Sequence, residues 1–176
     1  YGIFAKNIGS GALSITTTGT TTGTNKDGIK ANNSSAGTSL TINAATTTGG
    51  RNGIYAQNYG TGALSITATG TTTGSNGTGI NGYNSPTSTG NLTINAATTK
   101  GSGFGIIATN FGTGALSITT TGTTTGTAFT GIIASNSAKS TGDLTINAAT
   151  TTGDVYGIHA RNYGTGALNI TTSGVI

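Results

Sequence analysis

The acidic residues are the side chains of this chain that could carry acid–base chemistry. The sequence has no glutamate, and its only aspartates are Asp27, Asp143 and Asp154. Enzymes that cleave polysaccharides need facing carboxylates, or acids that hold calcium together with a base. Asp27 is remote in sequence from the other two aspartates, and Asp143 and Asp154 are predicted at different turns. We therefore expect no paired-carboxylate site and no metal site.

The only histidine, His159, could form a nucleophilic triad with Asp154 and a threonine hydroxyl. It occupies a position at which other repeats carry chemically unrelated residues, so we interpret it as a surface side chain. The chain has no cysteine, which excludes thiol chemistry and disulfides. We expect a protein that is not an enzyme, with no catalytic residue and no cofactor.

Basic residues give the chain a formal net charge of +4. They are spread along the sequence, so we expect no cluster and no nucleic-acid partner. The seven are Lys6, Lys26, Lys30, Arg51, Lys100, Lys139 and Arg161.

A dipeptide repeat dominates the sequence. Gly-Ile recurs at intervals of 25 or 26 residues, which predicts seven coils of about 26 residues each. We treat residues 1–176 as one repeat-built segment of a longer protein. The coils start at Gly2, Gly28, Gly53, Gly79, Gly105, Gly131 and Gly157.

Two coil types alternate. The odd coils read like GIYAQNYGTGALSITATGTTTG and the even coils like GIIASNSAKSTGDLTINAATTTG. Each coil carries an Ile-x-Ala strand and a Leu-x-Ile strand, with Gly82 replacing one alanine, and the threonine runs such as 20–22 and 46–48 supply a third strand. Alternation of this kind predicts strands with one buried face, so like residues should stack as inward ladders of a parallel β-solenoid.

The corners of the coils are predicted from glycine and asparagine. Glycine adopts positive φ at little cost, and asparagine tolerates the same region. An asparagine follows the coil-starting glycine by five residues in every coil, and its amide can pair with the same amide in the next coil. We predict a structural ladder of Asn7, Asn33, Asn58, Asn84, Asn110, Asn136 and Asn162.

Stacking is required because one coil buries too little apolar surface to offset the entropy of ordering its backbone. The first and last coils should each present an unpaired strand edge. We expect more coils, or another molecule, to cover both ends.

Two outward features could contact a ligand. In odd coils a bulky residue follows the ladder asparagine, namely Ile8, Tyr59, Phe111 and Tyr163, about 10 Å apart. These residues either shield the corner or form a contact surface, which would also include Tyr55, Ile107 and His159. The second feature is the hydroxyl column Ser14, Thr41, Ser65, Thr93, Ser117 and Thr145, which asparagine and alanine interrupt on its flank.

Over its whole length, the alternation of GIYAQNYGTGALSITATG and STGDLTINAATTTG resembles the passenger domains of bacterial autotransporters. The resemblance implies an all-β, right-handed, single-stranded and three-sided parallel β-helix, secreted and displayed on the outer membrane of a Gram-negative cell. Such domains often act in adhesion, self-association or biofilm formation. No catalytic residues are carried over.

We therefore expect a non-catalytic, extracellular stalk or adhesin segment of a bacterial surface protein. Its partners would be host or bacterial surface glycans and proteins, or other copies of itself, without insertion of this segment into a membrane. Two alternatives stay open. One is a subunit segment of a self-assembling extracellular filament, and the other is an ice-binding β-solenoid.

Overall fold

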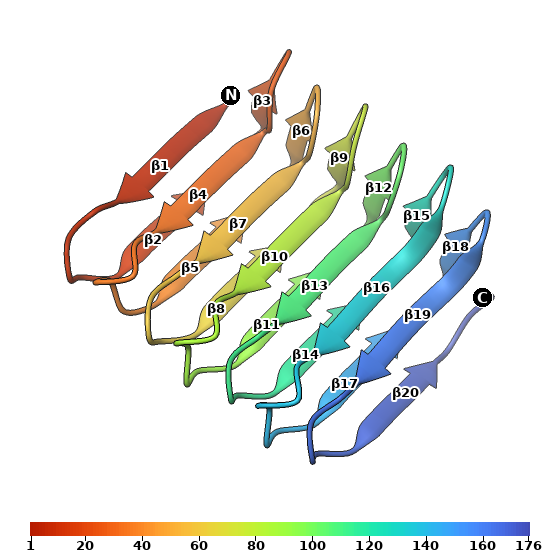
Figure 1. Cartoon of the computed structure of the whole chain (residues 1–176). Helices are drawn as coiled ribbons and strands as arrows, with labels where there is room; N and C mark the ends of the chain where they lie inside the picture. The colour runs from red at the N-terminus through yellow and green to blue at the C-terminus, as the bar shows by residue number, and fades with distance from the viewer.

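The computed structural model describes residues 1–176, which form strands and turns. It contains no helix that could span a membrane. The chain winds as a right-handed rod in which successive coils add strands to three parallel sheets (Figure 1). The first sheet contains β1 (Ile3–Asn7), β4 (Ile29–Asn33), β7 (Ile54–Asn58), β10 (Ile80–Asn84), β13 (Ile106–Asn110), β16 (Thr130–Asn136) and β19 (Tyr156–Asn162).

The other two sheets complete each coil. The second sheet contains β2 (Leu13–Thr17), β5 (Leu40–Ala44), β8 (Leu64–Ala68), β11 (Leu92–Ala96), β14 (Leu116–Thr120), β17 (Leu144–Ala148) and β20 (Leu168–Thr172). The third, a 6-stranded sheet, contains β3 (Thr21–Gly23), β6 (Thr47–Gly49), β9 (Thr72–Gly74), β12 (Thr99–Gly101), β15 (Thr124–Gly126) and β18 (Thr151–Gly153). The predicted three-sided parallel β-helix is confirmed.

The register pairs each core residue with its own kind. Ile29 lies opposite Ile54, and Ala31 lies opposite Ala56. In the second sheet Leu40 lies opposite Leu64. The core is one column of 24 buried apolar residues along the rod, and Ile54, Ile106 and the other interior isoleucines are fully buried. The predicted ladders of isoleucine, alanine and leucine are confirmed.

The third sheet buries threonine instead of an aliphatic residue. Thr47, Thr72 and Thr99 are fully buried, and their hydroxyl oxygens have no hydrogen-bond partner in the protein. The β-branched side chain suits the strand. Its methyl group fills the space beside a coil-starting glycine, because an added Cβ at Gly53 would lie 2.6 Å from Thr72 Cγ2.

Glycines are required at the corners for space and not for positive φ. The expectation of positive φ at the corner glycines and asparagines is wrong, since no glycine and no other residue of the chain has a positive φ. A Cβ at Gly49 would lie 1.7 Å from the Asn52 carbonyl oxygen, and one at Gly101 would lie 1.8 Å from the Phe104 carbonyl oxygen. The chain folds back on itself so closely at these corners that only glycine fits.

The ladder asparagines point inward at the end of each first-sheet strand. Asn33, Asn58 and Asn84 are fully buried. Asn33 Nδ2 donates to Asn58 Oδ1 at 2.8 Å, and Asn58 Nδ2 donates to Asn84 Oδ1 at 3.1 Å. Similar bonds join Asn7 to Asn33 and Asn110 to Asn136. Hydrogen bonding between coils thus satisfies amides that would otherwise be costly to bury.

Gly82 is the one position at which the alanine ladder lacks a methyl group. A Cβ there would make ordinary contacts of 3.4 Å with Ile94 Cδ1 and 3.5 Å with Ile66 Cδ1. We expect Gly82→Ala to raise the free energy of unfolding by about 1 kcal/mol, because it fills the gap and restricts the unfolded chain. Urea denaturation measures this change.

Gly101→Ala is the matched control, because its Cβ would collide with a carbonyl oxygen. It should lower the free energy of unfolding. Equal effects of the two alanines would contradict this account of where glycine is needed.

Candidate functional site

The ladder asparagines shape the turn that leaves the first sheet. In the third coil Asn58 Nδ2 donates to the Gly62 carbonyl at 2.8 Å, and Asn58 Oδ1 accepts the Gly60 N–H at 3.2 Å. Such bonds define an Asx turn. The same pair of bonds forms in the other odd coils. The residue between the asparagine and the glycine therefore lies on the outside, and its identity is Ile8, Tyr59, Phe111 or Tyr163.

Even coils place serine at the same point. Ser85 Oγ donates to the Tyr59 carbonyl at 3.1 Å, and Ser137 Oγ donates to the Phe111 carbonyl at 3.0 Å. Each serine thus holds the backbone of the aromatic residue in the preceding coil. The result is a turn in which bulky and small side chains alternate along the rod.

A continuous row of rings crosses three coils at this turn. The ring centroids of Tyr59 and Tyr83 are 5.6 Å apart, and those of Tyr83 and Phe111 are 5.7 Å apart. The planes are tilted, which is a favourable arrangement for aromatic pairs. Burial raises the pKa of Tyr83, and a smaller effect of Tyr59 acts in the same direction. Its phenol therefore stays protonated, able to donate a hydrogen bond.

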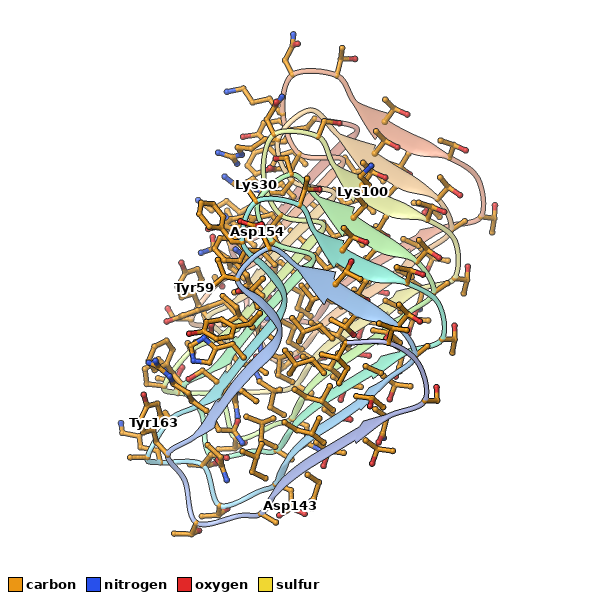
Figure 2. All side chains as sticks on the ribbon, turned by 90° about the vertical axis from the view of Figure 1, so that its right-hand side faces the viewer. Lys30, Tyr59, Lys100, Asp143, Asp154 and Tyr163 are labelled. Carbon is orange, nitrogen blue, oxygen red and sulfur yellow. The ribbon has the colours of Figure 1, made fainter.

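All of the chain's aromatic side chains lie on the first sheet or within two residues of its strands. Figure 2 shows rings gathered on the side that carries Tyr59 and Tyr163, while short side chains cover the rest. We call this side the aromatic face. Its members are Tyr1, Phe4, Lys30, Tyr55, Tyr59, Tyr83, Phe104, Phe111, Phe129, Tyr156, His159, Arg161 and Tyr163.

Basic side chains gather at the N-terminal end of this face. Lys30 Nζ lies 5.8 Å from the ring centroids of both Tyr1 and Phe4, and 5.6 Å from that of Tyr55. Arg51 lies 5.9 Å from the Tyr55 ring centroid. These are distances at which a cation is attracted to a ring. The expectation that the basic residues form no cluster is therefore wrong here.

Asp27 anchors this end. Its buried carboxylate accepts two hydrogen bonds from the Arg51 guanidinium, at 2.9 Å and 2.7 Å, and two from Asn52. Burial alone would raise the pKa of Asp27, but the bonds from Arg51 and Asn52 outweigh it and lower that pKa. Asn52 Oδ1 in turn accepts the Thr78 N–H, so the anchor extends over three coils.

A second cluster lies at the C-terminal end of the aromatic face. His159 Nε2 accepts a hydrogen bond from Arg161 Nε at 3.0 Å, and Arg161 Nη1 lies 3.5 Å from the Tyr163 hydroxyl. The His159 ring also packs on Tyr156, with centroids 5.2 Å apart. His159, Arg161 and Tyr163 line a shallow depression together with Ile133, Ala134 and Ser135.

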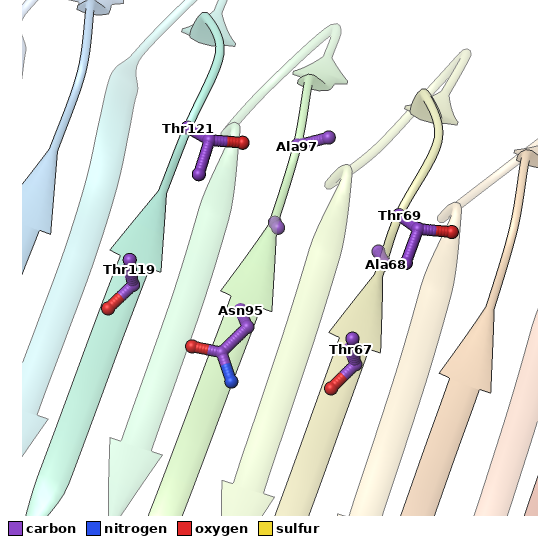
Figure 3. A pocket seen from close by; sticks show the side chains of 8 residues that line it. Thr67, Ala68, Thr69, Asn95, Ala97, Thr119 and Thr121 are labelled. Atoms are coloured by element: carbon purple, nitrogen blue, oxygen red, sulfur yellow. The ribbon is translucent and has the colours of Figure 1, made fainter.

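The remaining two faces carry short polar side chains. Shallow grooves follow the corner between the second and third sheets, and Figure 3 shows one lined by Thr67, Thr69, Asn95 and Thr119 with alanine at its floor. The register alternates Thr67 with Asn43 and Asn95. The second-sheet hydroxyl array is thus interrupted in the way that the sequence predicts.

The contact residues expected from the sequence all belong to one sheet. Tyr55, Ile107 and His159 share an outward column, and Tyr59, Phe111 and Tyr163 share the turn beside it. Sequence reasoning missed Tyr83, Phe4 and Lys30, although their outward positions in the repeat were readable. Asp143 lies in the turn after a first-sheet strand and Asp154 in the turn before one, so the two aspartates are at different corners as expected. The hydrogen-bond partner of His159 is Arg161 and not Asp154.

Comparisons with family models, curated proteins and solved structures found no match.

The lowered pKa of Asp27 predicts how stability depends on pH. A carboxyl whose folded pKa lies below its unfolded value of about 3.9 adds stability above that value, and this stability disappears as pH falls through the folded pKa. We expect Asp27→Asn to lower the free energy of unfolding by about 1 to 3 kcal/mol near pH 7. The difference from the wild type should shrink towards pH 2.

Urea denaturation across this pH range measures the effect, with exposed Asp154→Asn as the control. A destabilisation by Asp27→Asn that is the same at every pH would contradict the ionic role of Asp27.

Proposed function

We propose that this chain is a stalk segment of a bacterial surface protein and that its aromatic face is adhesive. It acts outside the cell, without catalysis, as a stiff rod that presents the face to glycans or proteins on another surface, or to other copies of itself. The observation that carries the proposal is the asymmetry of the three faces. Aromatic side chains occupy one of them, and threonine, serine and asparagine dominate the other two.

The chemistry of this face supports contact with a partner. Tyr59, Phe111 and Tyr163 are 39%, 42% and 59% exposed. Exposed aromatic groups that share one face mark interaction sites in other proteins. The rings of Tyr59 and Phe111 pack on Tyr83, which restricts their rotamers and reduces the side-chain entropy lost on binding. The resemblance to autotransporter passenger domains points to the same kind of role.

Binding of the labelled chain to bacterial and epithelial cells tests the proposal. Replacing Tyr59, Phe111 and Tyr163 together by serine, the residue that even coils carry at this turn, keeps the backbone bonds and removes the rings. We expect saturable binding by the wild type, and at least about a tenfold rise in the half-saturating concentration for the triple variant.

The matched control changes the third sheet, with Thr48→Ala, Thr73→Ala and Thr125→Ala. This variant should bind like the wild type. If both triple variants bind as the wild type does, or the wild type binds no surface, the adhesive role is wrong.

A second function, ice binding, is favoured by the outward face of the third sheet. Two columns of threonine run along it with one exception, Lys100, and all are exposed or half-buried. The columns are Thr20, Thr46, Thr71, Thr98, Thr123 and Thr150, and Thr22, Thr48, Thr73, Lys100, Thr125 and Thr152. Neighbours lie about 4.8 Å apart along the rod and about 7 Å apart across it. A regular lattice of hydroxyl and methyl groups can order water as ice does.

Thermal hysteresis at millimolar protein tests this second function. We expect Lys100→Thr, which completes the column, to increase the hysteresis, and Thr73→Lys with Thr125→Lys to abolish it. Tyr59→Ser is the control and should leave it unchanged. Absence of hysteresis in both the wild type and Lys100→Thr excludes ice binding.

A further inference from the structure

The spacing of the turn aromatics suits a long ligand that runs along the rod. Tyr59, Phe111 and Tyr163 lie two coils apart, which is about 10 Å between neighbours. Serine holds the intervening turns, and between Tyr59 and Phe111 the ring of Tyr83 continues the row. An extended polymer parallel to the axis would follow this row and meet a turn aromatic residue at every second coil. The C–H faces of pyranose sugars stack on aromatic rings, and two sugar units of an extended chain cover a similar length.

The charge of this face selects an acidic polymer. Lys30 and Arg161 project from first-sheet strands. The acid nearest to Lys30 along the chain, Asp27, is bound to Arg51. Asp154 lies before β19, at the end of the strand opposite Tyr163. Lys30 and Arg161 therefore have no carboxylate partner of their own, and the chain as a whole carries a formal charge of +4.

Arg161 is oriented for a carboxylate. Its Nε donates to His159 and its Nη1 is directed to the Tyr163 hydroxyl, which fixes the plane of the guanidinium. The side chain is exposed, so its remaining N–H groups are open to solvent. A planar guanidinium pairs with a carboxylate through parallel hydrogen bonds. The adjacent depression, lined by Ile133, Ser135 and Tyr163, can receive the sugar ring that carries this group.

We propose that the aromatic face binds an acidic polysaccharide lying along the solenoid axis, with sugar rings stacked on Tyr59, Phe111 and Tyr163 and a carboxylate paired to Arg161. Lys30 is in register with Tyr55, about 13 Å across the sheet from the turn, and attracts the polymer by its charge without a direct pair. The inference rests on the proposed adhesive function and gives it a ligand class. It assigns two separable contributions, stacking from the rings and charge from the cations. A neutral sugar polymer would gain only the stacking contribution. A nucleic acid would place flat bases, not the C–H faces of sugars, on the rings.

Titration with fluorescently labelled poly-β-mannuronate oligosaccharides tests the inference. β-Mannan oligosaccharides of equal length are the neutral control, because each of their sugar units carries a hydroxymethyl group in place of the carboxylate and is otherwise the same. We expect the wild type to bind the mannuronate polymer at least about tenfold more tightly than the mannan, with affinity falling as salt is raised.

Variants separate the two contributions. The serine triple variant at Tyr59, Phe111 and Tyr163 should weaken binding to both polymers. Lys30→Gln with Arg161→Gln should weaken only the binding of the mannuronate polymer, by at least about tenfold. The third-sheet variant Thr48→Ala, Thr73→Ala and Thr125→Ala should behave as the wild type, and circular dichroism of each variant confirms that the β-structure is retained.

Two results overturn the inference. One is equal binding of mannan and mannuronate, which would remove the role of charge. The other is mannuronate binding that neither set of face variants weakens, together with equal binding of single-stranded DNA, which would indicate attraction of any polyanion. If the chain binds cells through its aromatic face but binds neither polymer, the ligand class is wrong and the adhesive function stands.

Discussion

In-register pairing between successive coils is the constraint on which the rest of this structure depends. A single coil can shield its isoleucine, leucine and alanine side chains only with the same side chains of the coils before and after it. Inward positions therefore repeat the same residue or one of similar size, as where Ala96 lies opposite Thr120, and the corners admit only glycine where the backbone meets itself. Outward positions carry no such restriction. Apart from the buried Asp27, most of the chemical variety in this chain is found there.

The asparagine ladder connects this constraint to the surface. The amides of Asn7, Asn33, Asn58 and Asn110 each donate to the asparagine of the next coil, and all seven ladder amides donate to a backbone carbonyl of their own turn. The turn bonded in this way holds a bulky residue in one coil type, aromatic in all but the first coil, and a serine in the other, and Ser85 and Ser137 are bonded to the carbonyls of Tyr59 and Phe111. The alternation of coil types thus becomes a two-coil spacing of rings. An interior requirement determines the geometry of the exterior.

Much of the fold could be predicted because its cause is periodic. The positions of Ile54, Leu64 and Asn58 repeat in every coil, and stacking follows from their recurrence. The ion pair of Asp27 with Arg51 could not be predicted in the same way, since each residue occurs once and the pair depends on the path of one corner. The role of the corner glycines was wrongly assigned because two different causes, close approach of the backbone and a positive φ, both select glycine and look the same in a sequence.

Repetition also governs how such a rod would bind. Each ring of the aromatic face offers a modest contact, because a single exposed aromatic group buries only part of its surface against a ligand. A polymer that engages one ring is held near the next at a high effective concentration, so the contacts combine into an affinity that none provides alone. The ladders strengthen this effect because they make the rod stiff. The strands that carry the rings then stay at a fixed spacing, and a polymer bound to one ring remains aligned with the next. Regularity in the core and avidity at the surface are then two consequences of one repeat.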